Sequence, residues 1–209
     1  MLGPLMMKSV QKASHRGVTL IEMLVGIAVL GIVLATAVPS MSGMLERRRV
    51  IAAAGEIASI FVQARSESAS LGTKINVHLE DVPASVGDFS CVRLSTQAGA
   101  DTCRCNRSAE RVCSIGTGKL LREYLLPRDS SVTFTATGDW GSTNDHVVTL
   151  MKGRFLNDAT QDTNNVQVTV VGTRTQAKLR VDYISSGRVR TCSPDGSIGG
   201  FPVCPAVAS

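Results

Sequence analysis

The chain has 209 residues, a formal net charge of +5 at pH 7, 44% hydrophobic residues and 19% charged residues. This length fits one domain of ordinary size, and this composition excludes an intrinsically disordered chain. The excess charge is local, because the first 17 residues hold three basic side chains and no acid, and the remainder has 19 Lys and Arg against 17 acids. The overall charge therefore does not by itself indicate a nucleic-acid-binding protein.

Residues 18–38 form an apolar run of 21 residues in which Glu22 is the one ionisable side chain. A helix of this length, at about 1.5 Å per residue, spans a hydrocarbon core of about 30 Å. The basic residues before the run predict a cytoplasmic start and an exported remainder. The expected organisation is a leader at 1–17, the membrane-spanning half of a stem helix at 18–39, its amphipathic half at 40–72 and a β-rich globular head at 73–209.

Three kinds of N-terminal segment fit this run. A secretory signal peptide has the same layout, and Ala35-Thr36-Ala37 resembles its cleavage site. The second is a plain single-pass anchor, and the third is an anchor that is cut before the helix and enters a filament. Glu22 favours the third, because a carboxylate in a membrane helix costs up to about 2.5–3.5 kcal/mol. In a filament this acid pairs with the N-terminal ammonium of a neighbouring subunit.

The segment Gly17-Val18-Thr19-Leu20-Ile21-Glu22 resembles the type III signal of type IV pilins and type II secretion pseudopilins. The resemblance implies that prepilin peptidase cuts after Gly17, that Val18 becomes the N-methylated first residue, and that Glu22 acts in assembly. These families more often have Phe at the position of Val18. The implied partners are other pilins or pseudopilins and the inner membrane. The implied path leads from a single-pass anchor with a periplasmic head to a pilus or pseudopilus at or beyond the outer membrane.

The segment after the apolar run has the period of an amphipathic helix that ends at Gly72, a residue suited to helix termination. Polar side chains, Glu46 and Glu56 among them, are expected largely off the apolar face. The residues predicted to share that face, at intervals of three and four, are Val50, Ala54, Ile57, Phe61 and Ala64.

After Gly72 the sequence predicts short strands with one wet face, and hence an antiparallel sheet or a small sandwich. The long helix and this head together give an α+β, pilin-like fold, and their order resembles the GspH/FimT class of minor pilins and pseudopilins. Residues 95–118 are expected to form a disulfide-stapled loop. The predicted strands cover residues 75–79, 132–135, 147–150, 166–170 and 178–183.

Six cysteines follow the apolar run, which predicts disulfides in an oxidising compartment. A zinc site is the alternative, but no pair has the Cys-x-x-Cys spacing, and neither a metal nor a cofactor is expected. Cys192 and Cys204 are expected to close a loop of 13 residues. Because Cys103 and Cys105 are too close to pair, two pairings stay open for the other four: Cys91–Cys103 with Cys105–Cys113, or Cys91–Cys105 with Cys103–Cys113.

Basic residues gather near the C-terminus. In Gly187-Arg188-Val189-Arg190 the two arginines are two residues apart and point to the same side of an extended chain. Lys178 and Arg180 share the wet face of the preceding predicted strand, so up to four cations are expected to converge. Arginine forks match phosphate oxygens, and such contacts bind double-stranded DNA without reading its sequence.

The segment Gly187–Arg190 resembles the GRxR element of FimT-like minor pilins, which implies a role in DNA uptake. Asp182 and Asp195 are the acids nearby that would neutralise part of the patch.

The sequence contains no motif for an enzyme: no phosphate-binding glycine-rich loop, no G-x-S-x-G and no H-E-x-x-H. We therefore expect no catalytic residue. The main hypothesis is a minor pilin with DNA contacts. The alternatives are a pseudopilin that acts in protein secretion by a type II system and a secreted β-domain with an ordinary signal peptide.

Overall fold

The computed structural model describes residues 18–82, 89–96, 103, 105, 118–138, 147–155, 165–184 and 186–205. One long helix precedes two antiparallel sheets, so the α+β class expected from the sequence is confirmed. The elements are α1 (Leu20–Leu71), β1 (Ile75–Val82), β2 (Phe89–Thr96), β3 (Leu120–Pro127), the 3-10 helix η2 (Arg128–Ser130), β4 (Val132–Gly138), β5 (Val147–Met151), β6 (Arg154–Phe155), β7 (Val166–Gly172), β8 (Lys178–Tyr183) and β9 (Val189–Cys192).

The chain divides into two units, Met1–Met41 and Ser42–Ser209. In the first unit, the large apolar side chains between Val18 and Leu34 are 51–82% exposed. Within the described residues, no helix is both long enough and apolar enough to cross a membrane. The membrane span expected at residues 18–39 is not confirmed by that finding.

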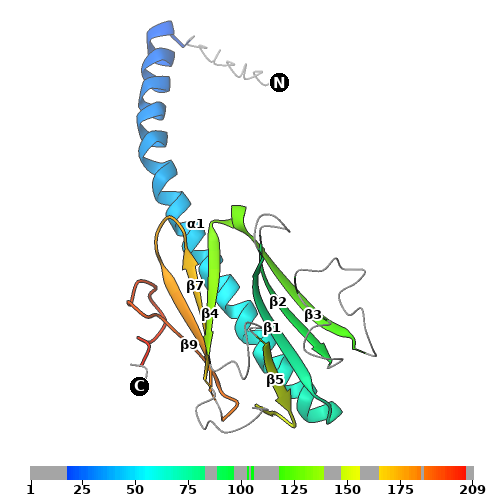
Figure 1. Cartoon of the computed structure of the whole chain (residues 1–209). Coiled ribbons are helices and arrows are strands. Elements are labelled where there is room, and N and C mark those ends of the chain that lie inside the picture. The colour runs from blue at the N-terminus through cyan, green and yellow to red at the C-terminus, as the bar shows by residue number, and fades with distance from the viewer. Residues whose placement is uncertain are drawn as a thin grey trace, which may run out of the picture. The chain divides into compact units, whose positions relative to one another are not determined.

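The second unit contains both sheets and the second half of α1 (Figure 1). The five-stranded sheet has the order β3-β2-β1-β5-β6, and the four-stranded sheet has the order β4-β7-β8-β9. Every strand pair is antiparallel. In β7, exposure alternates residue by residue, as expected for a strand with one buried face. The strands predicted from Val- and Thr-rich runs are all present.

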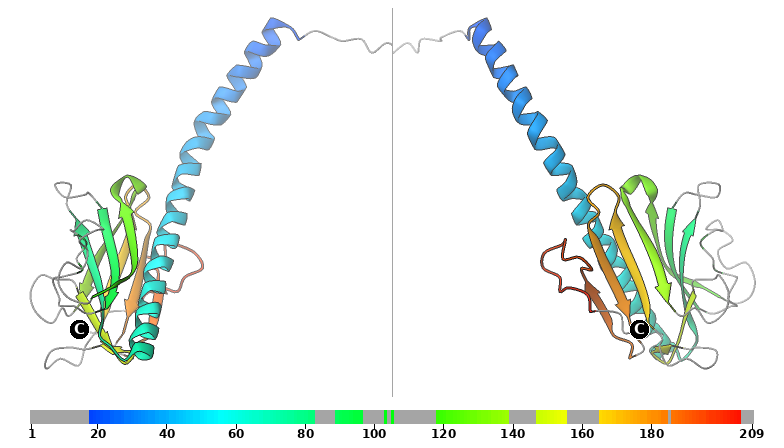
Figure 2. Two further views of the ribbon diagram at one scale, coloured as in Figure 1. Left: turned by 90° about the vertical axis from the view of Figure 1, so that its right-hand side faces the viewer. Right: turned by 60° about the vertical axis from the view of Figure 1, so that its left-hand side comes forward.

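One hydrophobic core contains residues of α1 and of both sheets, and the predicted apolar face of the helix belongs to it. Figure 2 shows the second half of α1 beside the strands of the head. Val50, Ala54, Ile57, Phe61 and Ala64 are all fully buried. The ring of Phe61 stacks on Tyr183 of β8 with centroids 5.1 Å apart. Burial raises the pKa of Tyr183 to about 12, against an opposing effect of the Arg65 charge. The amphipathic period of the sequence therefore correctly predicted which face of α1 packs against the sheets.

The expectation for Glu46 is wrong. This carboxylate is buried rather than on the wet side of the helix. Its Oε1 accepts hydrogen bonds from the backbone N–H of Arg174 at 3.1 Å and from the backbone N–H and the hydroxyl of Thr175 at 2.8 Å each. Gly172 leaves the room, since a Cβ there would overlap Glu46 Oε1. Glu46 thus attaches α1 to the turn between β7 and β8.

Further polar side chains attach α1 to other loops. Arg49 Nη1 donates to the carbonyl of Ser130 at 3.0 Å. At the far end of the helix, the hydroxyl of Ser68 accepts from the backbone N–H of Gly153 at 3.0 Å. The helix is therefore joined to the head by hydrogen bonds as well as by the core.

The cysteines form disulfides, as expected. Cys91 is bonded to Cys105, which decides between the two pairings that the sequence left open, and Cys192 is bonded to Cys204. Cys103 is also disulfide-bonded, and Cys113 lies outside the described residues. The disulfide between Cys91 and Cys105 argues against the alternative zinc site. Within the described residues no other group of His, Cys, Asp and Glu has the arrangement of a metal site.

Candidate nucleic-acid interface

The basic C-terminal element lies on the hairpin between β8 and β9. The turn is closed by two backbone hydrogen bonds, from Gly187 N–H to the carbonyl of Ile184 at 2.7 Å and from Ile184 N–H to the carbonyl of Arg188 at 3.1 Å. Gly187 has φ of +77°, a conformation that side-chain-bearing residues rarely adopt. The glycine of the Gly-Arg-Val-Arg segment is therefore required by the turn itself.

A side chain of α1 contacts this turn. Arg65 Nη1 of α1 donates to the carbonyl of Gly187 at 2.9 Å. A Cβ at position 187 would lie 3.0 Å from the Arg65 Nε atom, so glycine also lets the guanidinium approach. No local sequence pattern indicates this contact, because Arg65 and Gly187 are 122 residues apart.

Arg188 and Arg190 are both exposed, and β9, which begins at Val189, is an edge strand of its sheet. Residues two apart on an extended chain point to the same side, so the two guanidinium groups extend from one side of the strand. Neither arginine makes an ion pair within the described residues. These two cations are available to an anionic partner.

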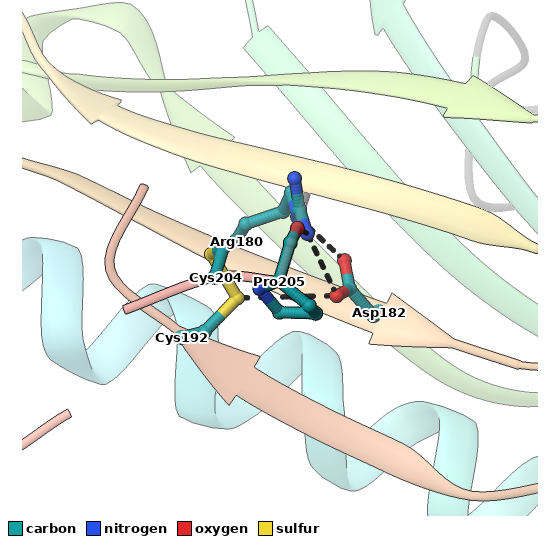
Figure 3. Close-up of polar contacts among 5 residues, drawn as sticks. All are labelled: Arg180, Asp182, Cys192, Cys204 and Pro205. Atoms are coloured by element: carbon teal, nitrogen blue, oxygen red, sulfur yellow. Dashed lines mark hydrogen bonds and ion pairs between the residues drawn. A yellow bond between two sulfur atoms is a disulfide. The ribbon is translucent and has the colours of Figure 1, made fainter. Parts of the chain in front are cut away.

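Arg180 is engaged differently (Figure 3). Its Nε donates to Asp182 Oδ1 at 2.7 Å, and its Nη2 donates to Asp182 Oδ2 at 3.1 Å. Nη2 also donates to the carbonyl of Pro205 at 3.2 Å. The side chains of this ion pair are only 12% and 8% exposed. Arg180 is therefore a paired and largely covered cation.

The four predicted cations do not converge. Lys178 is half-buried at the start of β8, whereas Arg190 lies opposite Asp182, four residues further along that strand. At about 3.4 Å per residue, this separation is roughly 14 Å along the strand. The sequence placed Lys178 and Arg180 correctly on one face, but it did not show that one of them is remote from the turn and the other is paired.

The disulfide between Cys192 and Cys204 closes the loop that follows β9. Inside this loop the carboxylate of Asp195 accepts hydrogen bonds from the backbone N–H of Ser197 at 3.0 Å and from the hydroxyl of Ser193 at 3.4 Å. The hydrogen bonds from Ser197 lower the pKa of Asp195. The carboxylate of Asp195 is thus hydrogen-bonded within its own loop. Asp182 is the acid that pairs with Arg180 and lies opposite Arg190.

The predicted processing site lies at the other end of the chain. Gly17 is outside the described residues, and Val18 is exposed. Thr19 precedes α1, and its Oγ1 accepts from the backbone N–H of Glu22 at 3.3 Å. Threonine before a helix and glutamate three residues later have the spacing of a capping box. This local role for Thr19 and Glu22 was missed, although the spacing was readable in the sequence.

Comparison with known proteins bears on the same N-terminal segment. Residues 12–38 match the model of the prokaryotic N-terminal methylation motif. No curated protein matches the chain.

Two solved structures are similar to this one. The type IV minor pilin FimU of Pseudomonas aeruginosa is 16% identical, with 70% of this chain and 90% of that chain covered and a TM-score of 0.43. The minor pseudopilin EpsH from the type 2 secretion system of Vibrio cholerae is 9% identical, with 69% and 97% covered and a TM-score of 0.41.

Proposed function

We propose that this chain, which has the N-terminal methylation motif of prepilins, is a minor subunit of a type IV pilus. We also propose that its head binds double-stranded DNA through Arg188 and Arg190. The chain is a structural subunit of a filament system and not an enzyme. Its N-terminal segment is a prepilin-type anchor. DNA contact at the head corresponds to a role in DNA uptake during natural transformation.

The observation that carries the DNA proposal is the pair of exposed arginines on a rigid turn. Arg188 and Arg190 lack ion pairs within the described residues, and the turn before them is fixed by Arg65 and by two backbone hydrogen bonds. The Cys192–Cys204 disulfide fixes the chain just after them. Because the backbone that carries the two arginines is already ordered, phosphate binding costs conformational entropy mainly in their side chains.

The expected DNA contacts are to phosphates rather than to base edges. Arg188 and Arg190 extend from an edge strand, and Tyr183, which lies opposite Val189 in the ladder, is buried against Phe61 and is not available to stack on a base. A site for single strands needs aromatic side chains on which bases stack. Binding that uses phosphates alone is insensitive to sequence and weakens steeply with salt.

The proposed site is tested by DNA binding of the full chain, purified in an uncharged detergent, to a 30-bp duplex. R188A/R190A is expected to weaken binding by at least tenfold and to reduce the slope of log Kd against log salt by about two, roughly one per lost phosphate contact. R128A is the control for the loss of an exposed arginine elsewhere on the head, because Arg128 lies in η2 and is paired with Asp81.

Equal binding by the wild type and R188A/R190A would overturn the proposed site. A wild-type chain that does not bind DNA at all would instead favour the alternative function, that of a pseudopilin in a type II secretion system. The neighbouring genes provide a second check, because genes for other minor pilins favour the first function and genes for a secretion apparatus favour the second.

We also propose where the exposed apolar helix of the first unit resides. Apolar side chains such as Leu20, Ile27 and Ile32, at 69–82% exposed, favour a non-aqueous environment. Before assembly this environment is the inner membrane, with the head in the periplasm. After prepilin peptidase has cut before Val18, it is the bundle of other pilin stems in the filament. Glu22 pairs there with the N-terminus of a neighbouring subunit.

A further inference from the structure

Asp182 faces two arginines, and the structure pairs it with only one. In the antiparallel ladder of β8 and β9, Asp182 lies directly opposite Arg190. Side chains at such positions share a face, with their Cβ atoms about 4.5–5.5 Å apart. Arg180 is on the same face, two residues before Asp182. Both carboxylate oxygens of Asp182 nevertheless accept hydrogen bonds from Arg180, while Arg190 stays exposed.

The C-terminal segment explains this choice. Cys192 lies opposite Arg180 in the ladder, and its disulfide to Cys204 brings Pro205 over the strand. The carbonyl of Pro205 then accepts a hydrogen bond from Arg180 Nη2 at 3.2 Å (Figure 3). Arg180 is thereby held between two acceptors and largely covered. A bidentate arginine–carboxylate pair in such surroundings is stronger and more directional than an exposed pair.

We infer that Arg180 is a positioning residue for Arg190: by occupying both oxygens of Asp182, it leaves Arg190 free to bind a phosphate. This inference rests on the proposed DNA contact at the same hairpin. Without Arg180, the covered carboxylate of Asp182 has lost its cation, and Arg190 is the nearest replacement across the ladder. A covered charge without a partner is costly, so Asp182 then draws Arg190 away from the DNA.

A simpler role for Arg180, a direct contact to phosphate, makes a different prediction. Both roles predict that R180Q weakens binding to the 30-bp duplex, by about threefold to tenfold, with a slope of log Kd against log salt smaller by about 0.9. Only the positioning role predicts that adding D182N reverses the loss. R180Q/D182N is expected to have the affinity and the salt slope of the wild type, because no carboxylate then competes for Arg190. R180K, which keeps the charge, is expected to bind like the wild type.

The matched control is R180Q/D129N. Asp129 is an exposed acid of η2, so this variant has the same net charge as R180Q/D182N but keeps Asp182. It is expected to stay as weak as R180Q. A thermal melt of each variant separates weak binding from loss of fold. If R180Q alone does not fold, wild type and R180Q/D182N are compared directly, and equal binding is the expected result.

Three results overturn the inference and leave the proposed DNA site intact. The first is a loss in R180Q that D182N does not reverse, the second is unchanged binding in R180Q, and the third is equal recovery in R180Q/D129N. Failure of both the wild type and R180Q/D182N to bind the duplex overturns the DNA proposal and this inference together.

Discussion

At the scale of single residues, the most informative side chain is Glu46. Burial acts to raise the pKa of this carboxyl group, but the hydrogen bonds from Thr175 and Arg174, with the charge of Arg174, lower it below the ordinary value of 4.5. The charged form is therefore the one that the folded head favours. Glu46 lies four residues before Val50 on the buried face of the helix, and the acid is accommodated there because the β7–β8 turn supplies its hydrogen-bond donors.

E46A is expected to lower the free energy of unfolding by about 1–3 kcal/mol, because it leaves the N–H groups of Arg174 and Thr175 without their acceptor. Urea unfolding of the full chain in detergent, followed by far-UV circular dichroism, measures the change. E67A is the control, since Glu67 lies on the same helix and its side chain makes no hydrogen bond or ion pair within the described residues. An equal loss in both variants would contradict the role given to Glu46.

Glu46 also makes stability depend on pH. Its pKa is lower in the folded than in the unfolded chain, so its stabilising contribution is present above the unfolded value and is lost as the pH falls through the folded value. The stability difference between wild type and E46Q is therefore expected to shrink on acidification below about pH 4.5. Urea midpoints at a series of pH values test this, and a difference that does not change with pH would contradict it.

At the scale of elements, the sequence pattern predicted most of the fold but not β2, β3 or the two-residue strand β6. The strand β2 is buried on both faces, so it lacks the alternation that marks a half-exposed strand. Each face holds a buried polar side chain with a partner on a neighbouring strand: Ser90 donates to Asp81 on one face, and Arg93 pairs with Glu123 on the other. Partners that are distant in sequence leave no local pattern. Arg180 and Asp182 are close in sequence, but the contact that holds Arg180 beside Asp182 comes from Pro205, 25 residues away.

The loop between Cys192 and Cys204 is the element whose removal is most readily measured. Closing a loop of 13 residues stabilises the folded state by about 3 kcal/mol in the chain-entropy model. C192S/C204S is expected to lower the free energy of unfolding by that amount and to weaken DNA binding, because Pro205 no longer holds Arg180. C91S/C105S is the control for DNA binding, because Cys91 lies in β2 of the five-stranded sheet, whereas the β8–β9 hairpin belongs to the four-stranded sheet. DNA binding that falls equally in both variants would contradict a specific role for the C-terminal loop.

At the scale of the whole molecule, the two proposed functions belong to separate ends of the chain. The N-terminal motif is proposed to act in processing and filament entry, and the C-terminal hairpin is proposed to bind DNA. The first was readable from a short local segment, Gly17 to Glu22, because peptidase recognition depends on contiguous residues. The second depends on a turn held by Arg65 and on which arginine Asp182 binds, and neither follows from contiguous sequence.

Mass spectrometry of the mature chain is expected to find N-methylated Val18 as its first residue. E22A is expected to leave this cleavage intact and to reduce incorporation into filaments at least tenfold, because the N-terminal ammonium of the neighbouring subunit loses its partner. Immunoblots of sheared filaments against whole cells measure incorporation. A mature chain that starts near Val38 would instead identify an ordinary signal peptide and contradict the pilin assignment.

The hydrogen bonds between α1 and the loops of the head have a mechanical consequence. They are spread from Glu46 to Ser68, about 33 Å along the helix axis. A pull along that axis loads them side by side together with the apolar core, so they share the force and do not fail one after another. The contact between helix and head is therefore loaded in shear along its whole length. A subunit built in this way transmits tension from its stem to its head without first unzipping either sheet.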